Sequence, residues 1–574
     1  MVDPILREVI RHRLMGAVAE MSETLKRAAY TPTIYEVLDF SNTLHSRSGD
    51  VVAQTLGIPI FLGAMSASCR AAIAAFCLEG FQPGDIVISN DPHLAGGSHV
   101  NDVNIIAPVF HDGNVVMFVQ SKAHWRDVGG KDAGSWSPDA TDVFQEGLRL
   151  PPVKLMVAGV LNEALLAVIT CNSRLPENAR GDLLAQVAAC RIGEKRVGEL
   201  IARYGIESLL AAMDAILDHG ERLIRAEIAQ IPDGTYTAED WLDADGREDK
   251  QVPIRVAVTV AGSDLVADFA GTGPQNPGGI ANTVLAGTSS AVRMAVKCLT
   301  NPQLPANEGC YRPITVLAPP GSCVNAQPPA PATVGLGSVA HVVIEVVLKA
   351  LAPVLPERAI ADTFGSINAM QIYGTDPATG RLFIHGMPYS GGWGARATKD
   401  GVSVLQGPVN GDCRNIPAEI VESKYPLRVE QYALIADSGG PGRTRGGLGA
   451  RVDYRILCDD ARLNTALIRY RRPPEGIFGG GAGKGNETVV DDETVLHRAS
   501  GYPLRRGALV SHRMGGGGGY GPALERTAES VARDVRYGYV TPQAARRDYG
   551  VVVDEQGNVD EVETARLRAE KAGR

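Results

Sequence analysis

The segment 176–230 constrains the fold most, because its apolar residues recur at helical spacing almost without interruption. It contains the runs LLAQVAACRIGEKRVGELIARYG and IESLLAAMDAILDHGERLIRAEIAQI. This spacing predicts two or three long helices, with breaks at Gly205 and Gly220. Strand patterns precede and follow the segment, so we expect a mixed α and β architecture.

The rest of the chain divides into lobes around this helical segment. Helical periodicity dominates 3–30 and 63–79, and the run IRVAVTVAGSDLVADFAG predicts a β-hairpin. We expect two to four interlocked lobes. Their ranges are 1–175, an α/β region; 176–231, the long helices; 232–430, an α+β middle domain; and 431–574, a glycine-rich, β-heavy region with a C-terminal helix.

Composition excludes several classes of function. The chain has 574 residues, of which 44% are hydrophobic and 21% charged, and its net charge is -9. These are ordinary globular values, and the acidic balance excludes a nucleic-acid partner. No apolar run approaches the roughly 20 residues that span a bilayer. We therefore expect a cytoplasmic protein that contacts neither nucleic acid nor membrane.

Three candidate metal ligands, His99, Asp102 and His124, lie in one short stretch. His99 and Asp102 stand three apart on a glycine-rich turn, in NDPHLAGGSHVNDV. His124 follows the apolar run Val115 to Val119, which predicts a strand that returns to the same place. Two imidazoles and one carboxylate suit Zn, Mn or Fe(II), and three protein ligands leave positions open for water or substrate. The alternative is that each side chain only braces a loop.

The glycine clusters do not form a nucleotide site. GGGAGKG at 479–485 resembles a phosphate-binding loop, but Phe478 stands at the first required glycine and Gly485 replaces the Ser or Thr that binds Mg²⁺. The run Gly515 to Gly519 allows close backbone approach or positive φ, and we interpret it as a structural turn. The chain therefore has no recognisable ATP site.

The same motifs resemble a known family. NDPHLAGGSHVNDV, AHWRDVGG and QEGLRLPPVKL are similar to the signature of the hydantoinase B/oxoprolinase family, and the similarity continues through RAAYTPTIYEVLDFSNTL, NEGCYRPI, DSGGPGRTRGGLG and GGGGGYGPALERTAESVARDVRYGYV. It covers essentially the whole chain. The family includes B subunits of ATP-dependent hydantoinases and lactamases, and its relatives include subunits of acetone and acetophenone carboxylases. The resemblance implies a multi-lobed, hydantoinase B-like fold.

The resemblance also implies the site. In the family, one divalent ion is held by the positions that correspond to His99, Asp102 and His124. The second His of the family's AHH segment is Trp125 here. If that position touches substrate, an indole would make the pocket narrower and more apolar, and Trp125→His should change substrate preference more than metal content.

The function that the resemblance implies is that of a catalytic B subunit of an ATP-dependent cyclic amide hydrolase, which opens a hydantoin, oxoproline or lactam ring. ATP and Mg would be bound by a partner A-type ATPase subunit, in a heterotetramer or larger assembly, and bicarbonate could take part. Two alternatives stay open. One is a subunit of a ketone carboxylase of the acetone or acetophenone carboxylase type, and the other is a non-catalytic assembly subunit.

Further residues of the signature are candidates for catalysis. Asp127 or Glu146 could act as general base, and Lys122 and Arg126 could neutralise phosphate or carboxylate oxygens. Ordinary solvated charges would explain the two cations equally well. Three more distant segments combine polar groups with aromatics or loops and could line the pocket. Their residues are Tyr35, Glu36 and Asp39; Tyr389, Trp393 and Arg396; and Asp412, Asn415 and Glu419.

Overall fold

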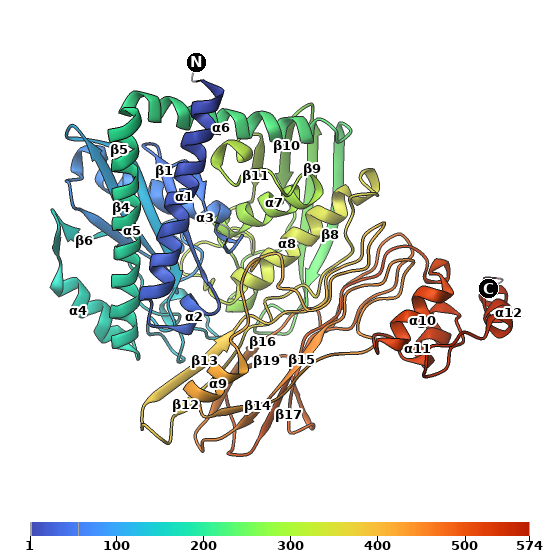
Figure 1. Ribbon diagram of the computed structural model, residues 1–574. Coiled ribbons are helices and arrows are strands. Elements are labelled where there is room, and N and C mark those ends of the chain that lie inside the picture. The colour runs from blue at the N-terminus through green and yellow to red at the C-terminus, as the bar shows by residue number, and fades with distance from the viewer. Residues whose placement is uncertain (1–2, 56, 573–574) are drawn as a thin grey trace.

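Four β-sheets organise residues 3–55 and 57–572, which the computed structural model describes. Helices alternate with sheets in the N-terminal half, whereas the C-terminal half is built mainly from strands and extended chain (Figure 1). The architecture is mixed α and β, as the sequence predicts.

The first sheet has the strand order β2-β1-β5-β4-β3-β6-β7. Helices α1 and α5 run side by side along one face (Figure 1), and α3 packs on the other face, where Lys122 of β5 lies 5.1 Å from the ring centre of Phe61. The strands are β1 (Phe40–Ser46), β2 (Val51–Gln54), β3 (Ile86–Ser89), β4 (Asp102–His111), β5 (Asn114–His124), β6 (Val153–Val157) and β7 (Val160–Leu161). The helices of this half are α1 (Pro4–Ala28), α2 (Pro32–Tyr35), α3 (Phe61–Phe76), α4 (Glu163–Asn172), α5 (Pro176–Tyr204) and α6 (Ile206–Ile228).

The long helical segment ends and restarts at one glycine. Helix α5 begins at Pro176, a residue whose missing N–H suits a first turn, and Gly205 separates it from α6 with φ at 79°. The second expected break is absent, because Gly220 lies inside α6. A Cβ at Gly220 would lie 2.5 Å from the side-chain oxygen of Asn307, so this glycine permits close packing and does not end a helix.

The second sheet has the order β11-β10-β9-β8 and packs against two helices. The expected hairpin is formed by β9 and β10, which pair antiparallel. Contrary to the expectation that no apolar run approaches the length of a membrane span, the helical stretch Gly335–Val354, which begins with α8, is long and apolar enough. Of its most apolar part, 94% is buried inside the protein, as in a core helix. The elements are β8 (Gly234–Leu242), β9 (Val252–Ala261), β10 (Asp264–Asp268), β11 (Ile314–Leu317), α7 (Leu285–Leu299) and α8 (Gly335–Leu351).

The last two sheets have the orders β13-β12-β16-β19 and β14-β15-β20-β17-β18. Residue 430, where we expected a boundary, lies inside β14, and strands from both sides of it share sheets. Three helices, α10, α11 and α12, stand at the far end of this region (Figure 1). The bounds are β12 (Met370–Thr375), β13 (Leu382–Met387), β14 (Leu427–Leu434), β15 (Ala450–Ile456), β16 (Arg462–Ala466), β17 (Glu487–Val490), β18 (Thr494–Leu496), β19 (Arg498–Pro503), β20 (Leu509–Arg513), α9 (Ala418–Lys424), α10 (Ala528–Arg536), α11 (Pro542–Tyr549) and α12 (Glu561–Ala572).

Glycines 515–519 are not a turn. They form an extended segment at the centre of a glycine bundle, which we define as residues 391–394, 439–449, 476–485 and 515–519. The amides of Gly516, Gly517, Gly518 and Gly519 donate in succession to the carbonyls of Lys484, Gly447, Asp362 and Gly481 at 3.1, 3.0, 2.8 and 2.9 Å. These four residues therefore bond three neighbouring segments, around Gly447, Asp362 and 481–484, which requires backbones without side chains between them.

Candidate active site

A cavity of about 100 Å³ lies where the ends of β4 and β5 meet α3 and the start of α8. His99, Asp102 and His124 all line it, together with Asp39 and Arg126. Much of the remaining wall is apolar and comes from distant segments. Its members include Val37, Ile58, Ile60, Phe61, Trp136, Leu336, Ile367, Met370, Met387 and Val409, with Thr33, Thr333, Gln371 and Asn410 as polar members.

Strand pairing brings the three candidate ligands together. Asp102 and His124 are direct partners in the antiparallel pairing of β4 with β5. His99 lies on the preceding turn, and its Nε2 is 3.1 Å from Asp102 Oδ1. The two imidazole rings are 5.1 Å apart between centres.

The chemistry of the donor set, two imidazoles and a carboxylate, suits a divalent ion. Nδ1 of His99 and Nδ1 of His124 are buried without a hydrogen-bond partner among the described residues, and Oδ1 of Asp102 has only the 3.1 Å contact with Nε2 of His99. Buried polar atoms rarely stay unpaired, so the two free imidazole nitrogens indicate a missing partner. The pKa of His124 is lowered to about 3 by burial and by the neighbouring His99, which keeps this imidazole neutral, the form that binds metals.

Asp39 adds a second carboxylate, and a fourth candidate ligand, to this wall. Its carbonyl accepts a hydrogen bond of 3.0 Å from the amide of His124, which fixes it at the end of β5. Burial and the nearby carboxylate of Asp102 raise the pKa of Asp39 to about 8 in the chain alone. A cation between the two carboxylates would remove that repulsion. From the sequence we expected Asp39 in the substrate pocket and not among the metal ligands.

Arg126 is the one cationic side chain among the described residues that line the cavity. It lies two residues beyond His124 and is 6% exposed. Its guanidinium donates to the hydroxyl of Thr33 and, at 2.6 Å, to the carbonyl of Gly386. The structure therefore places a positive charge beside the candidate metal ligands.

Lys122 lies behind the cavity wall. Its ammonium is buried beneath the ring of Phe61 and has no hydrogen-bond partner among the described residues. Burial lowers the pKa of Lys122 to about 8. Phe61 lines the cavity and Lys122 does not, so the contact of Lys122 with substrate oxygens stays a prediction.

The two expected general bases are bound to backbone amides and do not line the cavity. The carboxylate of Asp127 accepts from the amides of Gly129, Gly134 and Arg174 at 3.1, 2.9 and 2.7 Å. Glu146 is fully buried and accepts from the amides of Ala332 and Thr333 at 3.0 and 2.7 Å. Both carboxylates brace loops around the site, which differs from the catalytic role that we expected.

The variant Glu146→Gln distinguishes a structural role of Glu146 from a role as general base. The amide oxygen can still accept from Ala332 and Thr333, so we expect the rate of ring opening to change less than about tenfold, whereas loss of a general base lowers a rate by about 10² to 10⁴.

Burial raises the pKa of Glu146 to about 7, so the folded chain holds a proton that the unfolded chain releases above about pH 4.5. The contribution of Glu146 to the free energy of unfolding thus falls as pH rises from about 4.5 to 7. The Glu146→Gln variant should lack this pH dependence. Steady-state rates and melting temperatures across this pH range measure both effects.

Trp125 points away from the cavity. Successive residues of a strand face opposite sides, so His124 faces the site and Trp125 faces α5. The indole is 2% exposed, and its Nε1 donates to Gln186 of α5 at 2.8 Å. It does not line or narrow the cavity, and we now expect Trp125→His to act through core packing.

The other expected pocket residues lie elsewhere. Tyr389 is buried and donates to the hydroxyl of Tyr454 at 3.1 Å, and the indole of Trp393 donates to the carbonyl of Gln406 at 2.7 Å. Asn415 donates to the hydroxyl of Tyr432 at 2.5 Å. Those outside the cavity lining are Tyr35, Glu36, Tyr389, Trp393, Arg396, Asp412, Asn415 and Glu419.

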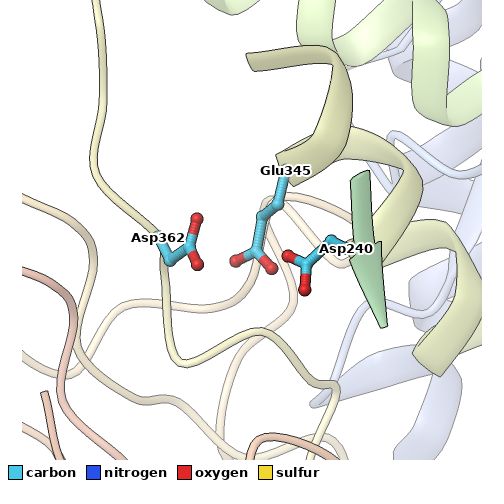
Figure 2. A group of neighbouring side chains, drawn as sticks. All are labelled: Asp240, Glu345 and Asp362. Atoms are coloured by element: carbon cyan, nitrogen blue, oxygen red, sulfur yellow. The ribbon is translucent and has the colours of Figure 1, made fainter. Parts of the chain in front are cut away.

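A second buried cluster contains three acids, Asp240, Glu345 and Asp362, whose carboxylates face one another (Figure 2). Their geometry could hold a metal ion. Two cations already stand among them. Arg469 donates to both oxygens of Asp240 at 3.1 and 2.7 Å and to Glu345, and Lys349 lies 2.7 Å from Asp240 and 2.9 Å from Asp362. We therefore interpret the cluster as an ion-pair network that joins the second sheet to the C-terminal half.

Arg469→Met tests this interpretation. It leaves three buried carboxylates with a single cation, and removing one member of a buried ion pair costs about 3 to 5 kcal/mol. We expect a melting temperature several degrees lower, measured by scanning fluorimetry. Arg381→Met, at a side chain that is 78% exposed, is the matched control and should change little. An unchanged melting temperature for Arg469→Met would contradict the structural role of the network.

The fold and the cavity define a multi-lobed α and β protein with a candidate metal centre of two imidazoles and two carboxylates at the end of a strand pair. The chain belongs to the hydantoinase B/oxoprolinase family, whose model matches residues 3–523.

Relatives extend over nearly the full chain. The B subunit of a putative D-/L-hydantoinase from Pseudomonas sp. (strain NS671) is 32% identical, with 99% of this chain and 98% of the relative covered. The beta chain of the caprolactamase from Pseudomonas jessenii is 32% identical over 99% of each chain. The crystal structure of the ATP-dependent caprolactamase from that organism matches with a TM-score of 0.93, at 30% identity over 99% of this chain and 100% of the other.

A nucleotide-free acetone carboxylase structure has the same fold. Its TM-score is 0.90 at 22% identity, and the match covers 100% of this chain and 83% of the other. The family is thus shown by sequence, and the fold is shared by a hydrolase and a carboxylase.

Proposed function

We propose that this chain is the metal-binding catalytic subunit of an ATP-dependent cyclic amide hydrolase that opens a hydantoin, oxoproline or lactam ring. One observation carries the proposal: His99, Asp102 and His124 line one small, mostly apolar cavity, and both imidazoles have a buried nitrogen without a hydrogen-bond partner among the described residues. Homologues named for hydantoin and lactam hydrolysis support the substrate class.

The proposed cofactor is one divalent ion, Zn, Mn or Fe. When bound, it would supply Lewis-acid polarisation of a carbonyl oxygen. His99, His124 and Asp102 would hold it, with Asp39 as a fourth ligand. Ser98 donates to Asp102 and so fixes the orientation of that carboxylate.

The chain's own residues would do the remaining work. The apolar wall, from Phe61, Leu336 and Met387 among others, would exclude bulk water and orient a small ring. Arg126 would neutralise negative charge on a substrate oxygen, because its guanidinium lines the same cavity.

A partner is part of the proposal. Ring opening of an unstrained amide gains from ATP, and the sequence has no recognisable ATP site, so an A-type ATPase partner would bind ATP and Mg and activate the amide oxygen or bicarbonate by phosphorylation. Relatives named as B or beta subunits of larger enzymes support this division of labour. We propose a heterotetramer or larger assembly in the cytoplasm, where ATP is available.

The proposal is tested with the chain co-expressed with an A-type partner. We expect the complex to convert a cyclic amide to the ring-opened acid only when ATP is present, and the chain alone to be inactive. Mass spectrometry of the product measures this. ATP turnover by the isolated chain at the rate of the complex would contradict the division of labour.

The fold shared with acetone carboxylase supports a second candidate, a subunit of a ketone carboxylase. The same ligand set would then stabilise an enolate that attacks activated CO2. A chain that only assembles the complex would not need buried metal-binding atoms without partners, and stoichiometric bound metal would exclude that alternative.

A further inference from the structure

Arg126 differs from the other deeply buried arginines of this chain. Arg469, Arg526 and Arg445 are 1%, 3% and 4% exposed, and each is within 3.3 Å of a carboxylate: Asp240 for Arg469, Asp400 and Asp534 for Arg526, and Asp534 for Arg445. Buried arginines are normally paired in this way.

Arg126 is nearly as buried but has no such partner. No Asp or Glu oxygen of the described residues lies within 4.0 Å of its guanidinium nitrogens. Both of its acceptors, the hydroxyl of Thr33 and the carbonyl of Gly386, are neutral. Asp39 stands on the same cavity wall but beyond ion-pair distance. The positive charge therefore has no ion-pair partner among the described residues, and Asp39 and Asp182 act on it only from beyond that distance.

The cavity gives a negatively charged ligand access to the guanidinium of Arg126. The guanidinium lines it together with His99, Asp102 and His124, so a ligand that reaches the candidate metal also reaches Arg126. A guanidinium presents paired N–H donors that match the two oxygens of a carboxylate. The rest of the wall is largely apolar and suits the carbons of a small ring.

We propose that Arg126 is a specificity-determining residue and that the substrate is a small cyclic amide that carries a carboxylate. This inference rests on the proposed ring-opening function and narrows its substrate class. The amide carbonyl faces the two histidines while the carboxylate pairs with Arg126. A phosphate group of an activated intermediate has similar oxyanion chemistry, and the test separates the two sources.

The test is equilibrium binding by the purified full-length chain, without ATP. The probes are 5-oxopyrrolidine-2-carboxylate, pyrrolidin-2-one and inorganic phosphate, measured by calorimetry. We expect the wild-type chain to bind the carboxylated ring at least about tenfold more tightly than the neutral ring. Arg126→Gln should abolish this preference, and Arg126→Lys should keep part of it.

Two controls distinguish loss of carboxylate recognition from a folding defect. Arg505→Gln makes the same change at a side chain that is 82% exposed and should leave the preference intact. Pyrrolidin-2-one should bind wild type and Arg126→Gln equally, because Arg126 has no part in recognising the neutral ring.

Equal affinity of the wild-type chain for both rings would overturn the inference. So would phosphate binding that depends on Arg126 when the carboxylated ring does not bind. The proposed function is judged separately. If the carboxylated ring binds through Arg126 but the complex with ATP does not open it, the hydrolase proposal fails while the carboxylate site stands.

Discussion

Replacing His124 with alanine is expected to remove the bound metal and ring opening together. His124 is the direct strand partner of Asp102, and its ring centre lies 5.1 Å from that of His99. Loss of one imidazole leaves too few ligands to hold the ion, and the Lewis-acid contribution of several kcal/mol disappears with it. At about 1.4 kcal/mol per factor of ten, we expect kcat/KM of the complex to fall at least a thousandfold. Metal content per chain, measured by mass spectrometry, should fall from one to near zero.

His111→Ala is the matched control for this prediction. His111 ends β4, the strand that pairs with the β5 strand of His124, but its side chain is 34% exposed and lies at the opposite end of β4 from Asp102. It should keep both metal and activity. A His124→Ala protein that stays active without metal would remove the mechanism that we propose.

Gly517→Ala is expected to prevent the C-terminal half from folding. An added Cβ would lie 2.1 Å from the carbonyl oxygen of Trp393 and 2.2 Å from its carbonyl carbon, so backbone would have to move. Gly517 sits in the middle of the glycine bundle, where its neighbours leave similarly little space. We expect destabilisation above about 4 kcal/mol, seen as loss of soluble protein or a much lower melting temperature.

Gly198→Ala is the contrasting substitution. Gly198 lies in α5 and has no atom within 4 Å of an added Cβ, so alanine should be neutral or slightly stabilising. If Gly517→Ala melted at the wild-type temperature, the segments of the bundle would have to lie farther apart than the structure places them.

Short-range sequence patterns predicted two helices and one hairpin, whose formation depends on residues close together in the chain. Helical spacing over 176–230 gave α5 and α6, and alternation with a turn gave the β9–β10 hairpin. The glycine bundle was not predicted, because its hydrogen bonds join segments far apart in the chain and an extended glycine run has no periodicity. The division into four domain ranges stays a prediction, apart from the boundary near residue 430 that the shared sheets cross.

The site was predictable where neighbouring strands form it. His99, Asp102 and His124 converge because β4 and β5 are consecutive and antiparallel. Trp136, Gln371 and Met387 were missed because they reach the cavity from distant segments, and this part of the lining depends on tertiary packing. The orientation of Trp125 was within reach of the sequence, since strand alternation puts adjacent residues on opposite faces.

The product formed from labelled bicarbonate tests the central claim most directly. The co-expressed complex would be given ATP, ¹³C-bicarbonate and a panel of cyclic amides and ketones, and the product mass would be measured. The account predicts a ring-opened acid without label in the product. A product that carries the label as a new carboxylate would contradict it and make the chain a carboxylase subunit.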